Sequence, residues 1–269
     1  MNVLLTGASG TLGKPLLAAL RSGGATVTAL SRRERVDSDG VRWVQGDLRT
    51  GEGLEAAVDG ASIVVHAATD GGAADGKVRL RYAVFHPRRT DVDGTRRLVD
   101  AARAKSVAHF VYVSIVGIDR VPYAYYRIKL AAERMVEQSG VPYSIARVTQ
   151  FHTYLDSLLR MSMRSPFPMA ARNLPVQPID PADAAAPIAR IATGEPAGGI
   201  VDIGGPEVLT GGQAADAWLD ARGSRRRFRS MPQMGRTVHA VAAGGLLTED
   251  RTGTVTWQKW LDEHVRERP

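Results

Sequence analysis

The chain has 269 residues, enough to bury the hydrophobic core of one α/β domain without covalent crosslinks. It contains no cysteine, which excludes disulfides, thiolate metal sites and cysteine nucleophiles, and fits a reducing cytoplasm. The formal net charge is +7, but the basic residues are scattered along the chain, so we expect a solvated surface with an anionic cofactor rather than nucleic acid.

The first 150 residues alternate apolar strands with amphipathic helices, which is the pattern of a parallel sheet with helical crossovers. Strands are predicted at residues 2–6, 26–30, 41–45, 62–67, 109–114 and 143–147. Helices are predicted at residues 12–22, 53–58, 88–104 and 123–139. This order predicts an α/β fold, a Rossmann domain with a doubly wound parallel sheet over residues 1–150.

Beyond residue 150 the pattern is broken by prolines at 166, 168, 175, 178 and 181. Helices are predicted at 181–192, 211–221 and 256–265, with a strand at 199–203. We interpret residues 151–269 as a smaller substrate-side lobe that packs on the first domain in one compact unit and returns some elements to its sheet. No apolar run reaches the roughly 20 residues that a membrane span needs, and no targeting signal precedes the first strand, so a soluble cytoplasmic protein is expected.

A glycine-rich turn lies between the first strand and the first helix. Gly7, Gly10 and Gly13 are spaced G-x-x-G-x-x-G. Gly7 permits the tight turn, Gly10 lets backbone N–H groups approach a pyrophosphate, and Gly13 permits close contact between helix and strand. Because a helix N-terminus also favours a bound anion, the turn predicts a dinucleotide site. Its expected contacts are Gly7, Ser9, Gly10, Thr11, Leu12 and Gly13.

The end of the second strand indicates which dinucleotide binds. Ser31-Arg32-Arg33 places two guanidiniums, and no carboxylate, where an NAD site holds the ribose 2′-hydroxyl. We therefore expect NADP(H) in preference to NAD(H), with an exposed basic loop as the alternative reading. Farther along, Asp47 is expected to accept from the adenine amino group and Leu48 to pack on its ring, although Asp47 is equally suited to cap a helix.

Several motifs together resemble a known superfamily. They are the glycine turn, Asp47-Leu48, His66-Ala67-Ala68, residues 111–114, and the sequence Tyr125-Tyr126-Arg127-Ile128-Lys129. The chain resembles extended or atypical short-chain dehydrogenases/reductases, most closely the NmrA-like, NAD(P)-binding subgroup, and the resemblance continues to residues 257–261. It implies further cofactor contacts at Ala67, Ala68, Lys129, Val148, Gln150 and Phe151.

The catalytic candidates are Ser114, Tyr125 and Lys129. Tyr125 and Lys129 are four apart on a predicted helix and so share one face, while Ser114 ends a strand at the carboxyl edge of the sheet. A nearby ammonium and the nicotinamide would lower the pKa of the Tyr125 phenol. The resemblance implies that Tyr125 protonates a carbonyl oxygen, Lys129 tunes Tyr125 and binds the nicotinamide ribose, and Ser114 donates to the substrate oxygen.

Two neighbours of these residues leave alternatives open. Tyr126 is an adjacent candidate for the role of Tyr125. Asp91 stands where many relatives carry an asparagine that holds the lysine through water. Asp91 would either replace that asparagine electrostatically, weaken the relay, or lie on the helix surface without a role.

Substrate contacts are expected near Phe151, and at lower weight from Tyr82, Phe85 and His152, with His86 beside them. The alternative is that these aromatic residues anchor a loop and that His152 is an ordinary histidine. The dispersed histidines predict no metal site. The function expected is NADPH-dependent reduction of a ketone, quinone or enone with tyrosine as general acid. The alternatives are an NAD(P)H-binding redox sensor without turnover, and a nucleotide-sugar epimerase or dehydratase. The expected partner is a small-molecule substrate, and self-association into a homo-oligomer stays open.

Overall fold

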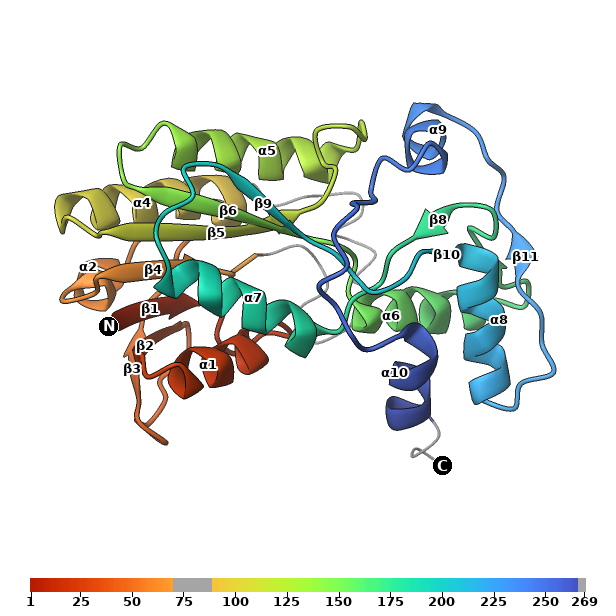
Figure 1. Cartoon of the computed structure of the whole chain (residues 1–269), viewed down its shortest axis with the longest axis horizontal. Helices are drawn as coiled ribbons and strands as arrows, with labels where there is room; N and C mark the ends of the chain where they lie inside the picture. The colour runs from red at the N-terminus through yellow and green to blue at the C-terminus, as the bar shows by residue number, and fades with distance from the viewer. Residues whose placement is uncertain (70–88, 266–269) are drawn as a thin grey trace.

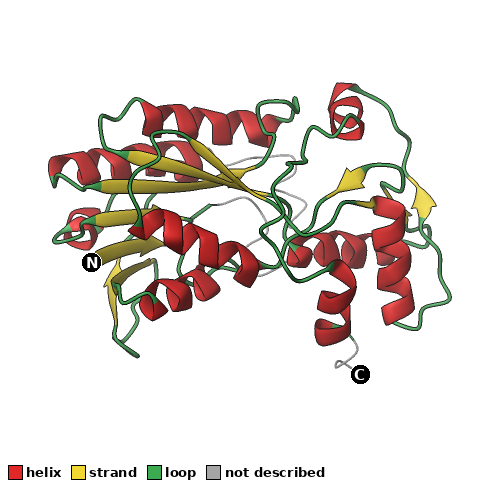
Figure 2. Ribbon diagram, in the orientation of Figure 1, coloured by secondary structure: helices red, strands yellow, loops and turns green. Residues whose placement is uncertain are grey.

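The apolar runs in the first half of the chain form the strands of a parallel sheet, and their side chains are buried on both faces of that sheet. The structure, a computed structural model, describes residues 1–69 and 89–265. Within these residues the main sheet has seven strands in the order β3-β2-β1-β4-β5-β6-β9, all paired in parallel (Figures 1 and 2). The strands are β1 (Asn2–Thr6), β2 (Thr26–Ser31), β3 (Val41–Gln45), β4 (Ile63–His66), β5 (His109–Ile115), β6 (Tyr143–Val148) and β9 (Ile200–Ile203). The predicted doubly wound sheet is confirmed.

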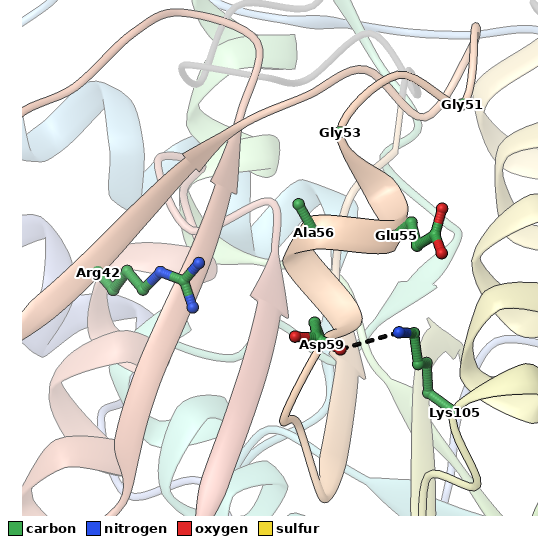
Figure 3. A pocket seen from close by; sticks show the side chains of 7 residues that line it. All are labelled: Arg42, Gly51, Gly53, Glu55, Ala56, Asp59 and Lys105. Carbon is green, nitrogen blue, oxygen red and sulfur yellow. Dashed lines mark hydrogen bonds and ion pairs between the residues drawn. The ribbon is translucent and has the colours of Figure 1, made fainter.

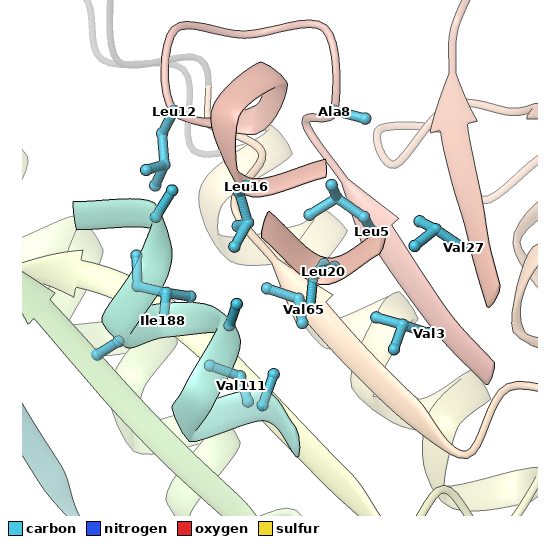
Figure 4. Close-up of a cluster of buried hydrophobic side chains, with 14 of the residues drawn as sticks. Val3, Leu5, Ala8, Leu12, Leu16, Leu20, Val27, Val65, Val111 and Ile188 are labelled. Carbon is cyan, nitrogen blue, oxygen red and sulfur yellow. The ribbon is translucent and has the colours of Figure 1, made fainter. Parts of the chain in front are cut away.

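Helices cover both faces of this sheet (Figure 2). The helices of the sheet region are α1 (Gly13–Ser22), α2 (Leu54–Val58), α4 (Thr95–Ala104), α5 (Ala124–Glu137) and α7 (Pro181–Thr193). The strand periodicity of two divides β1 between the faces: Val3 and Leu5 pack with α1 and α7, whereas Leu4 packs with α2, α4 and α5. Figure 4 shows Leu16 and Leu20 of α1 and Ile188 of α7 meeting over this first face.

One predicted helix begins in an unexpected form. The segment expected to be helical over 88–104 opens with a π-helical turn, η2 (Arg89–Gly94), before α4 starts at Thr95. π-Helical turns are rare and occur often at functional sites. This turn buries Asp91, which is 2% exposed, and Thr95, which is fully buried.

The C-terminal lobe is built around aromatic rings. Its elements are α6 (His152–Met163), β7 (Met169–Ala170), β8 (Pro175–Val176), β10 (Leu209–Thr210), α8 (Gly211–Ala221), β11 (Arg229–Ser230), α9 (Arg236–Ala242) and α10 (Trp257–His264). Trp218, Trp257 and Trp260 form its core with Leu159 of α6 and Phe228. Helices α8 and α10 were predicted, whereas α6, α9 and the four short strands were not.

The lobe is interleaved with the sheet rather than contiguous over 151–269. Strand β9 pairs with β6, and α7 packs on α1, as the expected return of some elements to the sheet requires. The fully buried Gln177 joins the two regions: its amide donates to the carbonyls of Gly205 and Asp250, at 3.0 and 2.9 Å, and accepts from the Thr248 N–H at 3.0 Å. Every helix in the described residues is too short or too polar to cross a bilayer.

Candidate dinucleotide and catalytic site

Two positions of the glycine turn after β1 have no room for a side chain. Gly7 has a φ of +76°, and a Cβ there would lie 2.8 Å from backbone atoms of Ala67 and Ala68. A Cβ at Gly13 would overlap the carbonyl oxygen of Gly7. The Gly10 N–H donates to the Gly7 carbonyl at 2.9 Å and closes the turn. Gly7 therefore lets the turn approach the residues after β4, and Gly13 lets the start of α1 approach the residues after β1.

The N-terminus of α1 fits a phosphate group. No side chain hydrogen-bonds to the first turn of this helix, and Leu12 at its N-cap has helical backbone angles. Uncapped N–H groups at a helix start form an anion site when the backbone is this closely accessible. Ser9 is exposed and Thr11 is half-buried beside the turn, so both are placed to contact a pyrophosphate.

A buried histidine that the sequence analysis did not assign connects the turn to η2. The His66 ring lies 2.7 Å from the Thr6 hydroxyl through Nδ1 and 3.0 Å from the Thr95 hydroxyl through Nε2. Thr95 donates its one hydroxyl hydrogen to the Asp91 carbonyl at 2.8 Å, so Nε2 is the protonated ring nitrogen. Nδ1 then accepts from Thr6, whose oxygen accepts from the Ala68 N–H at 3.3 Å. Burial lowers the pKa of His66 to about 3, which keeps the ring neutral.

The end of β2 presents the basic residues as expected. Arg32 and Arg33 are exposed, and the Ser31 hydroxyl accepts from the Arg33 N–H at 3.2 Å. Nearby, the Arg49 side chain pairs with the Asp47 carboxylate at 2.6 Å and its N–H donates at 2.9 Å. These hydrogen bonds from Arg49 are the main reason that the pKa of Asp47 is lowered, and Arg32 adds to the effect.

The alternative reading of Asp47 as a helix cap is wrong. Helix α2 follows Gly53, which has a φ of +72°, and no side chain caps it. Asp47 instead forms a local turn with Arg49, so part of its capacity to accept hydrogen bonds is already used. Leu48 is 6% exposed and packs with Leu30 and Leu54 in the core, which leaves little of its surface for an adenine ring.

Lys129 and Ser114 are brought to the same edge of the sheet. Lys129 is 4% exposed, donates to the Val113 carbonyl at 2.9 Å and lies 4.2 Å from the centroid of the Tyr112 ring. Burial lowers the pKa of Lys129, while Asp91 and Glu133 act against this. Among the described residues the buried Ser114 hydroxyl has no hydrogen-bond partner.

Tyr125 lies in the first turn of α5, and its environment differs from the prediction. Its hydroxyl lies 2.8 Å from Thr69 Oγ1, and Thr69 donates to the Asp91 carboxylate at 2.6 Å. Burial, followed by the charge of Asp91, raises the pKa of Tyr125 well above its ordinary value. The expected lowering by Lys129 is thus not found in the protein alone. Because Asp91 is buried, the reading of it as a helix-surface carboxylate is also wrong.

Tyr126 does not share this environment. Its ring packs edge-on against Tyr123 at 5.1 Å and lies 6.4 Å from the Tyr125 ring. Tyr154 of α6, with 37% of its surface exposed, lies close enough to both residues to affect their pKa values. Tyr125, not its neighbour, is therefore the tyrosine that is hydrogen-bonded to Thr69, which in turn donates to Asp91.

The segment after β6 corrects one predicted contact. Val148 is buried in the core, Gln150 precedes α6, and Phe151 is half-buried at the N-cap of α6. His152 is fully buried and packs against the rings of Trp257 and Trp260 at 5.5 and 5.7 Å. The prediction that His152 lines a substrate pocket is wrong, because distant aromatic residues enclose it. Tyr82, Phe85 and His86 lie outside the described residues.

A pocket on the flank of the sheet is separate from this site. It lies along α2, and Figure 3 shows the Lys105–Asp59 ion pair, at 2.8 Å, on one of its sides. Its lining contains none of the predicted site residues: Arg42, Gly51, Gly53, Glu55, Ala56, Asp59 and Lys105. The described part of the chain contains no group of three or more side chains suited to hold a metal.

Comparison with known proteins assigns the family. A family model described as NAD(P)H-binding matches residues 7–157, more than half of the chain. The chain belongs to this NAD(P)H-binding family. The matched segment runs from Gly7 past Tyr125 and Lys129, and it confirms the NAD(P)-binding family that the sequence motifs indicate.

Individual relatives carry different names. Photosystem II assembly factor Ycf39 of Cyanophora paradoxa is 29% identical over 158 residues, 56% of this chain and 46% of that protein. A 4-hydroxy-2-methyl-3-oxo-4-farnesyl-3,4-dihydroquinoline-1-oxide ketoreductase of Stigmatella aurantiaca is 34% identical over 122 residues, 44% of this chain and 34% of that one. The aligned region thus spans half or less of these two relatives. The structure of NADPH-dependent quinone oxidoreductase QOR2 of Escherichia coli, complexed with NADPH, has a TM-score of 0.78 at 19% identity and covers 97% of this chain and 99% of that one, which shows a shared fold.

Proposed function

We propose that this family member is an NADPH-dependent reductase that converts the carbonyl group of a small ketone, quinone or enone to an alcohol. The proposal is supported by four features at the carboxyl edge of the sheet: the uncapped glycine turn, the buried Lys129, the Ser114 hydroxyl, which has no hydrogen-bond partner among the described residues, and Tyr125. The reductase name of the Stigmatella relative supports the same reaction class.

The side chains divide the chemistry among them. A bound dinucleotide supplies the hydride to the carbonyl carbon. The Tyr125 hydroxyl gives its proton to the carbonyl oxygen, so the O–H bond of the phenol breaks as the O–H bond of the alcohol forms. The Ser114 hydroxyl donates a hydrogen bond to the same oxygen, and the Lys129 ammonium, which donates to the Val113 carbonyl at the same edge of the sheet, would hold the nicotinamide ribose.

The preference for NADPH follows from the charges at the end of β2. The exposed side chains of Arg32 and Arg33 stand free to pair with a 2′-phosphate. Asp47 does not oppose this because Arg49 already neutralises it. The Arg32→Ala, Arg33→Ala double variant is expected to bind NADPH at least tenfold more weakly, with NADH binding nearly unchanged.

The deciding experiment is turnover with a matched pair of variants. Purified protein is titrated with NADPH and NADH, and oxidation of the reduced nicotinamide is followed with a panel of ketones, quinones and enones. Tyr125→Phe is expected to lower kcat by about 10²–10⁴-fold, whereas Tyr126→Phe, which removes the neighbouring hydroxyl, leaves most of the activity. Equal loss in both variants, or none in Tyr125→Phe, contradicts the assigned acid.

A second candidate is an NAD(P)H-binding regulator without turnover, which the assembly-factor name of the Cyanophora relative favours. Tight NADPH binding with no oxidation by any acceptor would support it.

We further propose a small-molecule substrate and no nucleic-acid partner, because the basic residues form no motif. A cytoplasmic location is supported by the absence of cysteine.

A further inference from the structure

The Tyr125 hydroxyl belongs to a short chain of hydrogen bonds that ends in a buried carboxylate. Tyr125 Oη lies 2.8 Å from Thr69 Oγ1, and Thr69 Oγ1 lies 2.6 Å from Asp91 Oδ1. The three residues come from the segment after β4, from η2 and from α5. None of the motifs that identify the family includes Thr69.

The direction of these bonds follows from counting hydrogens. An ionised carboxylate only accepts, so Thr69 donates its single hydroxyl hydrogen to Asp91. Thr69 then has only lone pairs to offer to Tyr125, and the phenol is the donor in the 2.8 Å bond. A phenolate has no hydrogen to donate, so this arrangement requires Tyr125 to be protonated.

Asp91 is fixed in place from its backbone. Its carbonyl accepts from Thr95 at 2.8 Å, and Thr95 accepts from the neutral His66 ring at 3.0 Å. The π-helical turn places the carboxylate inward, where 2% of the residue is exposed. In such surroundings a charge acts on its neighbours with little screening by solvent.

The other charged and titratable groups around the phenol are few in the described part of the chain. Tyr126 on α5 and Tyr154 on α6 lie close enough to raise the pKa of Tyr125, and Tyr125 in turn raises the pKa of Tyr112 on β5. The buried Lys129 interacts with Asp91 and Glu133 and donates to the Val113 carbonyl.

We propose that Thr69 and Asp91 are positioning residues that hold Tyr125 as a protonated, oriented phenol, so that the acid for carbonyl reduction stays loaded into the alkaline range. During reduction the Tyr125 hydrogen turns from Thr69 to the carbonyl oxygen of the substrate, and the O–H bond of the phenol breaks as that of the alcohol forms, while Thr69 keeps its hydrogen bond to Asp91. This inference rests on the proposed function for its role in turnover, but the state of Tyr125 is measurable without it.

The negative charge of Asp91 determines in which direction the alkaline limb of the pH profile moves when Asp91 is replaced. Reduction needs the protonated phenol, so kcat/KM falls as pH rises through the Tyr125 pKa. Asp91 raises that pKa, and Asp91→Asn removes the charge while keeping the size and an accepting oxygen. The alkaline limb of the Asp91→Asn profile is therefore expected at least about one pH unit lower than in the wild type.

Thr69 is tested separately because its side chain is exposed and its substitution leaves the core intact. Thr69→Val keeps the shape but removes the bridge, and kcat is expected to fall about tenfold with KM little changed. Thr69→Ser restores the hydroxyl and is expected to recover most of the loss. Asp93→Asn, which removes an equal charge two residues from Asp91, is expected to leave the profile in place.

The titration of Tyr125 is read directly by NMR of protein labelled with carbon-13 at tyrosine Cζ, with the Tyr125 signal assigned from Tyr125→Phe. A signal that stays in the phenol form at alkaline pH in the wild type and titrates earlier in Asp91→Asn supports the proposal. An unchanged titration in Asp91→Asn, or equal activity of Thr69→Val and the wild type, overturns it. If Tyr125 titrates as expected but no carbonyl compound is reduced, the proposed function fails while the control of the phenol by Asp91 stands.

Discussion

The sheet region and the C-terminal lobe achieve burial by different means. Aliphatic side chains fill both faces of the sheet, and their periodicity along strands and helices is plain in the sequence. The lobe depends on three tryptophans and on buried polar side chains such as Gln177 and Asp156, whose partners lie far away along the chain. Elements with repeating apolar patterns can therefore be predicted from residues that are close in the sequence. Aromatic and polar contacts between distant residues depend on the completed fold.

The largest expected effect lies in the sheet region, at a buried ion pair among its aliphatic side chains. Arg147 of β6 makes two hydrogen bonds to the buried Glu133 of α5, at 3.0 and 2.7 Å, and a third to Asp119 at 2.7 Å. Arg147→Met leaves the carboxylate of Glu133 buried without its partner and is expected to cost about 3–5 kcal/mol in urea unfolding. The double variant with Glu133→Leu is expected to recover most of this loss, and no recovery would contradict the assignment.

A smaller loss is expected at the joint between the two regions. Gln177→Met preserves volume but leaves the Gly205 carbonyl and the Thr248 N–H without their Gln177 partner, and removes one of the donors to the Asp250 carbonyl. The unfolding free energy is expected to fall by about 2–3 kcal/mol. If the lobe unfolds separately from the sheet in this variant, two transitions will appear where the wild type has one. A change below about 0.5 kcal/mol would show that the joint does not depend on this residue.

Each region contains one histidine whose pKa is lowered to about 3: His66 in the sheet and His152 in the lobe. The unfolded chain binds a proton near the ordinary value of 6.5 and the folded chain does not. Each histidine therefore reduces stability by about 1.4 kcal/mol per pH unit as pH falls from about 6.5 to about 3. The free energy of unfolding, measured in urea at several pH values across this range, is expected to change less steeply with pH in His152→Phe than in the wild type. The difference corresponds to one proton fewer taken up on unfolding. An equal slope would mean that His152 is protonated in the folded protein.

The smallest expected effect concerns the N-terminus of α8, which is compared with the N-terminus of α1. Thr210 caps α8 in a reciprocal capping box with Gln213, whereas no side chain caps α1. Thr210→Ala is expected to cost about 1 kcal/mol and to leave NADPH affinity unchanged. Thermal unfolding with and without NADPH separates these quantities. A lower affinity in Thr210→Ala would connect α8 to the nucleotide site, against the present assignment.

Sequence patterns predicted the sheet, the glycine turn, the crossover helices and helix α8 because these depend on neighbours close in the chain. The position of Tyr125 and Lys129 on one helix face was likewise predictable from their spacing. Thr69 was missed because only the π-helical start of η2 brings Asp91 against it. His152 was misassigned because α10, far along the chain, supplies the rings that enclose it.

The chain of hydrogen bonds through His66 carries a consequence for how such a sequence can diverge. Two runs of hydrogen bonds end at Asp91: one leads from Ala68 through Thr6, His66 and Thr95 to its backbone carbonyl, and the other leads from Tyr125 through Thr69 to its carboxylate. Each hydroxyl has one hydrogen to give, so replacing one member reverses or breaks the donor order of the next member of the same run. Tolerated changes are therefore expected in pairs within one run, such as Thr6→Val with His66→Phe.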